Sequence, residues 1–102
     1  MKITLSQVIE IVAKETGVSV NDIINPTRKQ EAVLARHISM WACRWNTTET
    51  LPKIAAAHNR KQHGSVIHAA NNIDSLVSER SRSYDAKIAV ICTKIVNQLN
   101  IK

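Results

Sequence analysis

Hydrophobic residues recur three and four positions apart along most of the chain, as they do on the buried face of a helix. This spacing predicts six helical segments. They cover about residues 5–16, 20–24, 31–46 and 51–58, a stretch from residue 62 or 63 to about 81, and a last stretch from about residue 83. The sequence contains no convincing strand pattern and no internal repeat. We therefore predict an all-α fold of about six helices in a small bundle.

The predicted helices are separated by residues that favour helix ends. Gly17 stands where a helix commonly ends, and the residue before Pro26 is pushed out of the helical region. Residues 27–30 are polar and basic without an apolar period, which predicts an exposed loop. Thr50 is expected to cap the fourth helix, with Pro52 in the first turn, where its missing N–H costs nothing.

A short helix, a tight polar turn and a longer helix follow one another over about residues 51–80, which is the order of a helix-turn-helix. Gln62, His63 and Ser65 stand at the N-terminus of the longer helix, where their donors and acceptors suit base edges or phosphates. An alternative is that Gln62 and Ser65 only cap the helix. In both cases the backbone N–H groups of the helix start can hold a phosphate.

Length and composition indicate one ordinary globular domain over residues 1–102. The chain is 44% hydrophobic and 22% charged, which is typical of a folded protein. It has three aromatic residues and no Phe, so the core has to be built from aliphatic side chains. Trp41 and Trp45, four residues apart on one helix face, are expected in that core. Cys43 and Cys92 are expected to be small buried hydrophobes.

Several classes of protein are disfavoured by what the sequence lacks. No apolar run approaches the roughly 20 residues that span a bilayer, and no secretory signal is present, so we expect a cytoplasmic protein with no membrane partner. No P-loop or glycine-rich cradle is present, so we expect no nucleotide, no cofactor and no enzymatic activity. A metal or catalytic site is disfavoured because its candidates have poor ligand spacing. These are His37, Cys43, His58, His63 and His68.

The positive charge is concentrated in one part of the sequence. The net charge is +6, and residues 26–63 hold seven basic and two acidic side chains, which leaves +5 there. Such a region is either a solvated basic face or a surface for an acidic partner, nucleic acid included. Because it coincides with the predicted helix-turn-helix, the charge favours nucleic acid.

Two stretches of the sequence resemble the C-terminal DNA-binding domain (domain IV) of the bacterial replication initiator DnaA. The stretch from Arg28 to Trp41, RKQEAVLARHISMW, is similar to that family's basic loop and following helix, R-K-R-E-I-V-x-[AP]-R-Q-I-A-M-Y. LPKI at residues 51–54 and KQHGSVIHA at residues 61–69 resemble its signature, L-P-E-I followed by R-D-H-[ST]-T-V-[LI]-H-A. Order and spacing agree, so the resemblance covers nearly the whole chain and implies a Trp-repressor-like helical fold.

The resemblance implies a mode of DNA binding. The basic loop would enter the minor groove of a DnaA-box-like site while the helix starting near His63 reads the major groove. The residues that match contact or reading positions are Arg28, Lys29, Gln30, Arg36, His37, Lys53, Lys61, Gln62, His63, Gly64 and Ser65. Lys53 of this set and Arg44 are nearby cations with a weaker assignment. His68 also matches the signature but is expected to turn inward or support the fold.

Four reading positions depart from the family pattern. Gln30 replaces the minor-groove arginine and His37 replaces a glutamine, while Gln62 replaces an acidic residue and Gly64 a hydroxyl residue. Glutamine prefers the paired donor and acceptor of adenine, so the recognised site is expected to differ from the usual box. Loss of the loop arginine is expected to weaken binding to A·T tracts.

We therefore expect a nucleoid-associated protein that binds double-stranded DNA and regulates replication or transcription, for example by competing for initiator sites. The chain starts with Met1 and has no ATPase region, which suggests a stand-alone protein or else an excised domain. Two alternatives stay open. One is a helical protein-interaction module with a basic surface, and the other is a DNA binder without sequence preference.

Overall fold

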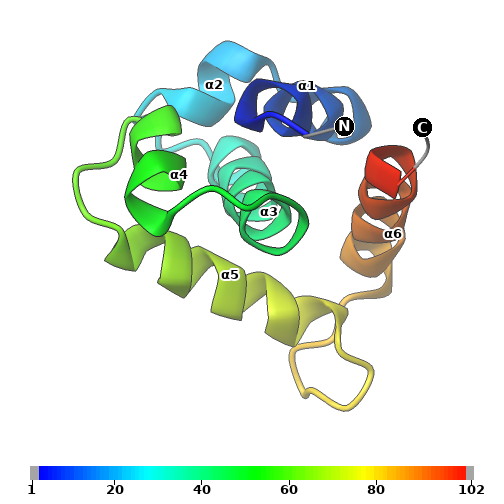
Figure 1. The fold of residues 1–102 in the computed structure, drawn as a ribbon. Helices are drawn as coiled ribbons and strands as arrows, with labels where there is room; N and C mark the ends of the chain where they lie inside the picture. Colours follow the sequence, from blue (N-terminus) through cyan, green and yellow to red (C-terminus); the bar gives the residue numbers. More distant parts are fainter. Residues whose placement is uncertain (1–2, 101–102) are drawn as a thin grey trace.

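The computed structural model describes residues 3–100, so the two residues at each end of the expected 1–102 domain lie outside the described part. This part contains six helices and no strand, which confirms the predicted all-α class (Figure 1). The helices are α1 (Leu5–Thr16), α2 (Val20–Ile24), α3 (Gln30–Asn46), α4 (Leu51–Ala57), α5 (Gly64–Val77) and α6 (Ala86–Asn100).

Local capping explains where the first helices begin and end. The Thr4 hydroxyl accepts from the Gln7 backbone N–H while the Gln7 side chain accepts from the Thr4 N–H, which forms a capping box. Gly17 ends α1 with a left-handed φ of 75°, a conformation that favours glycine. Ser19 caps α2 by accepting from the Asp22 N–H. The caps at Thr4, Gly17 and Ser19 give α1 and α2 the bounds predicted from the sequence.

Helix α3 is the centre of the fold and contacts each of the other five helices. Figure 1 shows it enclosed by α1 and α2 on one side, α5 below and α6 at the right. Its apolar residues join one continuous core built mainly from aliphatic side chains, as composition predicted. The largest fully buried members include Ile23, Ile38, Met40, Ile54, Ile73 and Ile95.

Helices α4 and α5 form the predicted helix-turn-helix. Thr50 caps α4 by accepting from the Lys53 N–H, and Pro52 lies in the first turn. The turn reverses at Asn59, whose φ is 55°, and the Arg60 N–H donates to the Ala55 carbonyl at 2.8 Å. Asn59 tolerates this left-handed conformation better than most residues, so α5 leaves the turn in a defined direction.

The end of α5 and the start of α6 differ from the prediction. Helix α5 ends at Val77 instead of about 81, and α6 begins at Ala86 instead of about 83. Residues 78–85 form consecutive turns that return the Asp85 N–H to the Leu76 carbonyl at 2.8 Å. The Asp85 carboxylate then accepts from the Lys87 and Ile88 N–H groups, which starts α6. This side-chain acceptor competes with continued helix across the polar segment.

Three expectations about apolar side chains have different outcomes. Trp41 is buried, and its indole N–H donates to the Asp74 carboxylate at 2.8 Å. Trp45 was expected in the core but is 55% exposed and stacks under the Arg44 guanidinium at 4.9 Å. On α5, Ile67 is 36% exposed, and Val66 and Ala70 take the inner face. Both cysteines are free and buried, as predicted.

No helix in residues 3–100 has the length and apolar character needed to cross a membrane.

Candidate nucleic-acid interface

The N-terminal end of α5 presents its first residues to solvent. His63 occupies the N-cap position without making a side-chain cap hydrogen bond. Gln62, His63 and Gly64 are exposed, and a Cβ built on Gly64 would meet nothing within 4 Å. Capping therefore does not occupy the His63 side chain, and a partner can approach the helix start closely.

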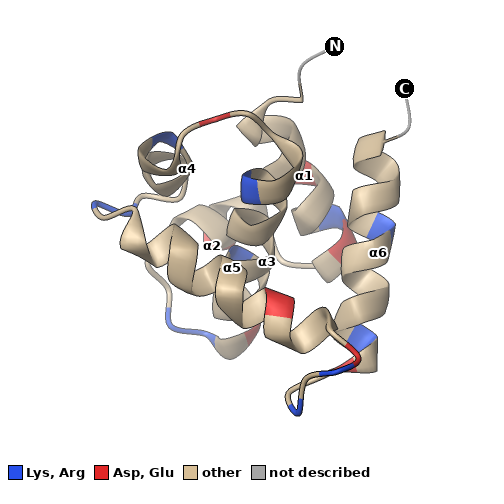
Figure 2. Cartoon of the chain, turned by 60° about the horizontal axis from the view of Figure 1, so that its bottom comes forward, with Lys and Arg blue, Asp and Glu red and all other residues tan. Residues whose placement is uncertain are grey.

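Basic residues surround this helix end. Figure 2 shows Lys and Arg on two segments beside the start of α5, the turn from α4 to α5 and the connection from α2 to α3. Arg28 and Lys29 are exposed in the second segment, and Lys61 is exposed in the first. The Asn59 side-chain amide donates to the Ile24 carbonyl at 3.0 Å, which ties the two segments together.

Arg36 has a different position from the one expected of a DNA contact. It is 3% exposed, and its Nε donates to the Ile23 carbonyl at 2.8 Å. Its Nη2 donates to the carbonyls of Asp22, Asn25 and Thr27. Burial lowers the pKa of this guanidinium, with a smaller contribution from Arg60. The structure therefore differs from the expected direct DNA contact: Arg36 is buried and holds the loop that precedes α3.

His37 and His68 lie together at the edge of the interface. Their ring centroids are 6.1 Å apart in an edge-to-face arrangement, and the Asn72 amide nitrogen is 3.2 Å from His37 Nδ1. Burial lowers the pKa of His37, and His68, Arg36 and Arg60 lower it further. His68 is exposed, so the expectation that it turns inward is wrong. The next two residues of α5, Ala69 and Ala70, are the buried ones.

The remaining candidates Lys53, Gln30 and Arg44 lie at three different places on α3 and α4. Lys53 is exposed on α4 and pairs with Glu49 at 4.0 Å, a surface ion pair of small energetic value. Gln30 is exposed as the first residue of α3. Arg44 lies eight residues beyond Arg36 on α3, about 12 Å along the axis, and stacks on Trp45 away from the start of the helix.

His58, one of the histidines considered as a metal ligand, has another role. His58 is buried, with Nδ1 donating to the Ile54 carbonyl at 2.8 Å and Nε2 2.7 Å from the Ser39 hydroxyl. Within residues 3–100, no three His, Cys, Asp or Glu side chains gather in a way that could hold a metal ion. His58 instead satisfies two buried polar groups between α3 and α4.

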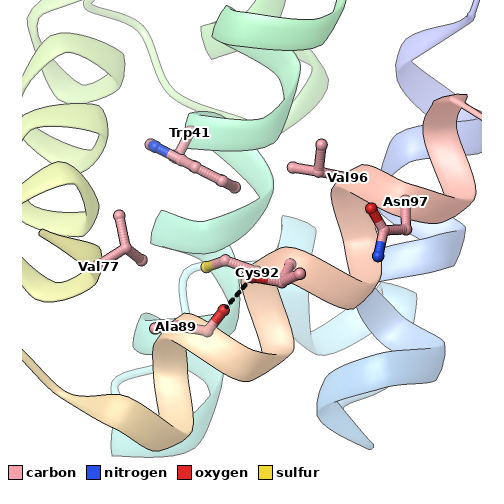
Figure 3. A pocket seen from close by; sticks show the side chains of 7 residues that line it. Trp41, Val77, Ala89, Cys92, Val96 and Asn97 are labelled. Carbon is pink, nitrogen blue, oxygen red and sulfur yellow. Dashed lines mark hydrogen bonds between the residues drawn. The ribbon is translucent and has the colours of Figure 1, made fainter.

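A pocket of about 290 Å³ lies at the C-terminal end of α5, away from the helix start (Figure 3). Trp41 forms one wall and Cys92 and Val96 of α6 form another, and the lining contains no charged residue. Val77, which also lines it, is 13 residues beyond Gly64, about 20 Å along the helix axis. Burial raises the pKa of the Cys92 thiol to about 12, so this sulfur is a poor nucleophile.

Two contributors to the interface were missed among the sequence candidates. Arg60 lines a polar pocket with His37 and Ser65. In the sequence it was only one of the cations in the basic region. Asn59 links the turn to α2. The available signal was the run Asn59-Arg60-Lys61, in which an Asn suited to a left-handed turn precedes two cations.

Comparison with known proteins agrees with this arrangement. The family model described as "Bacterial dnaA protein helix-turn-helix" matches residues 5–73. The chromosomal replication initiator protein DnaA of Oenococcus oeni is 34% identical over 93 residues, which are 91% of this chain and 20% of that protein. The same protein of Streptococcus pyogenes is 36% identical over 97 residues, covering 92% of this chain and 21% of that protein.

A solved structure has the same fold. A protein titled "Crystal structure of DNA replication initiation factor" matches with a TM-score of 0.73 and 30% identity, over 93% of this chain and 29% of that chain. This chain spans about a fifth of the length of the known relatives. The family model covers more than half of the chain, including α4 and most of α5, and the relatives and the solved structure match over more than nine-tenths of it. The chain therefore belongs to the bacterial DnaA helix-turn-helix family.

Proposed function

We propose that this chain binds double-stranded DNA sequence-specifically, with the start of α5 in the major groove and the α2–α3 connection at the minor groove. The observation that carries the proposal is an exposed, uncapped helix start placed between two basic segments. A helix-turn-helix docks in this way, with the N-terminal residues of its second helix at the base edges. Family membership supports DNA binding in general.

The roles of the candidates follow from their exposure. Gln62 and His63 are exposed at the start of α5, where an amide and an imidazole can read donor and acceptor patterns. Lys61 beside them suits a backbone phosphate. Arg28 and Lys29 suit the negative potential of a narrow minor groove.

The recognised site is proposed to be a variant of the family's DnaA box. Gln62 takes the place of an acidic residue and favours adenine over cytosine at its base pair. Gly64 has no side chain to contact a base, and its open surroundings leave space for the DNA backbone or a base edge.

We further propose that the chain acts by occupying DNA in the cytoplasm, at the nucleoid, as a regulator of replication or transcription. Competition for initiator sites is the simplest form of such regulation, because two proteins with similar helix-turn-helix surfaces can share a target.

Selection of bound duplexes from a random pool tests the proposal. We expect enrichment of one site, whose affinity falls with salt at a slope of about −0.9 per phosphate neutralised. His63→Ala should flatten the preference at one base pair by about 1–3 kcal/mol, whereas Lys61→Ala should weaken all duplexes equally. Sequence-specific binding is refuted if no site is enriched at moderate salt. DNA binding itself is refuted if no duplex binds at low salt.

A further inference from the structure

A small polar pocket of about 140 Å³ lies between α3, the α4–α5 turn and α5. Its lining residues are Arg36, His37, Met40, Arg60, Ser65 and His68. Four of these carry a guanidinium or an imidazole, one carries a hydroxyl, and none carries a carboxylate. A pocket lined in this way repels cations and attracts an anion.

The positive charge of the pocket has no anionic partner in the described residues. Within residues 3–100 the one ion pair joins Lys53 and Glu49, outside this pocket. Nε and Nη2 of Arg36 donate to backbone carbonyls, and the guanidinium keeps its positive charge. Arg60 is only partly exposed, and its planar guanidinium suits two oxygens of a phosphate. The pocket therefore has one uncommitted guanidinium beside a fixed positive charge.

His37 is a half-buried titratable side chain in the pocket lining. The charged or titratable groups acting on it are Arg36 of its own helix, Arg60 of the turn and His68 of α5. All of them oppose a further positive charge, and burial opposes it most, which lowers the pKa of His37. In the neutral ring, Nδ1 accepts from the Asn72 amide, which leaves the proton on Nε2.

We infer that this pocket binds one phosphate of the DNA backbone and that His37 takes up a proton when the phosphate enters. The inference rests on the proposed function, because it requires DNA at the α5 face. The pocket is small enough for a single phosphate group and is bordered by Ser65 in the first turn of α5. The family pattern has glutamine, which takes up no proton near neutral pH, at the position of His37.

The direction of the pH effect follows from the two states of His37. A phosphate beside the ring favours the charged form, so the pKa of His37 is higher in the complex than in the free protein. Between these two pKa values, binding takes up protons and the affinity rises as the pH falls. One proton gives at most about a tenfold change in affinity per pH unit. Above both values the affinity no longer changes through this group.

The first experiment measures the affinity for the selected duplex by fluorescence anisotropy between about pH 8 and about pH 5.5, at fixed ionic strength. We expect the wild-type chain to bind about three- to tenfold more tightly at the lower pH. His37→Gln should remove most of this ratio. His63→Gln, outside the pocket, is the matched histidine control, whose own affinity is free to fall but whose pH ratio should persist. Circular dichroism verifies that both variants are folded.

The second experiment identifies the anion. Duplexes with a single neutral methylphosphonate linkage are scanned along the backbone. We expect neutralisation of one linkage to abolish the difference in affinity between the two pH values for the wild-type chain. The same linkage should leave the pH dependence of His37→Gln unchanged. Histidine NMR titration with inorganic phosphate alone forms the other arm. A response to inorganic phosphate without any effective methylphosphonate position would overturn the DNA assignment.

The outcomes separate this inference from the proposed function. Failure to bind DNA at every pH would refute the proposed function itself. Normal sequence-specific binding with the same pH ratio in wild type and His37→Gln would overturn only the proton uptake by His37. A ratio that disappears in His37→Gln and persists in His63→Gln supports the inference.

Discussion

Replacing Arg36 with methionine tests whether this arginine stabilises the fold or contacts DNA. Methionine keeps the length and apolar stem of the side chain but removes the guanidinium. In the structure that group donates to four backbone carbonyls at the end of α2 and in the loop before α3. The carbonyls of Ile23 and Asn25 lose their closest donations, and a hydrogen bond to a charged group contributes about 1.5–3 kcal/mol.

We therefore expect Arg36→Met to lower the free energy of unfolding by about 3 kcal/mol in the absence of DNA. Urea denaturation followed by circular dichroism measures this change. The free energy of unfolding of Arg36→Lys should lie between those of wild type and Arg36→Met, because an ammonium cannot reproduce the planar arrangement of donors. Arg28→Met is the matched control, since Arg28 is exposed in the same loop and should change stability by less than about 0.5 kcal/mol.

The positioning role is refuted if Arg36→Met unfolds at the same urea concentration as wild type and only loses DNA affinity. A surface arginine that contacts phosphate would give that result, because its removal leaves no buried carbonyl without a donor. Arg28→Met should lose affinity under either role, because Arg28 is proposed to lie at the minor groove, so the urea midpoint of Arg36→Met decides. Under the positioning role, Arg36→Met alone loses stability.

Three further predictions concern buried groups. Trp41→Phe removes the indole donor to Asp74 and should destabilise the fold by about 1–2 kcal/mol in urea denaturation; an unchanged midpoint would contradict it. Burial lowers the pKa of His58, so the unfolded chain binds its proton more readily. Stability should then decrease as the pH falls below about 6.5, measured in a His37→Gln background, and a flat profile would exclude a neutral buried His58. Both cysteine thiols have a pKa raised to about 12 by burial, so a thiol reagent at neutral pH should react at the rate of unfolding, not within seconds.

Periodicity predicted most of the fold because each helix shows its buried face in local spacing. The boundaries of α1 and α2 follow from Thr4, Gly17 and Ser19, whose effects extend over only a few residues. Trp45 could not be placed in this way. It shares a helix face with Trp41, but it lies one turn nearer the end of α3, and only the packing of the neighbouring helices decides where the core stops.

The candidate interface was predicted in part. The charge count located it, and the family resemblance selected Lys61 to Ser65, which the structure brings to one helix end. The sequence could not show that Arg36 turns inward, because an arginine at the surface and one bound to carbonyls can have the same local sequence. Nor could it bring Arg60 beside His37, which are 23 positions apart.

The sequence by itself determined the helical class, the helix-turn-helix and the region of positive charge, because these depend on short-range spacing and on side-chain chemistry. Tertiary structure decided which cations remain free and which are used inside the protein. Arg28 stays in solvent, whereas Arg36 reaches four carbonyls that only the α2–α3 connection presents together. The physical reason is that burial and hydrogen bonding depend on neighbours distant in the chain, and these also shift the pKa of His37.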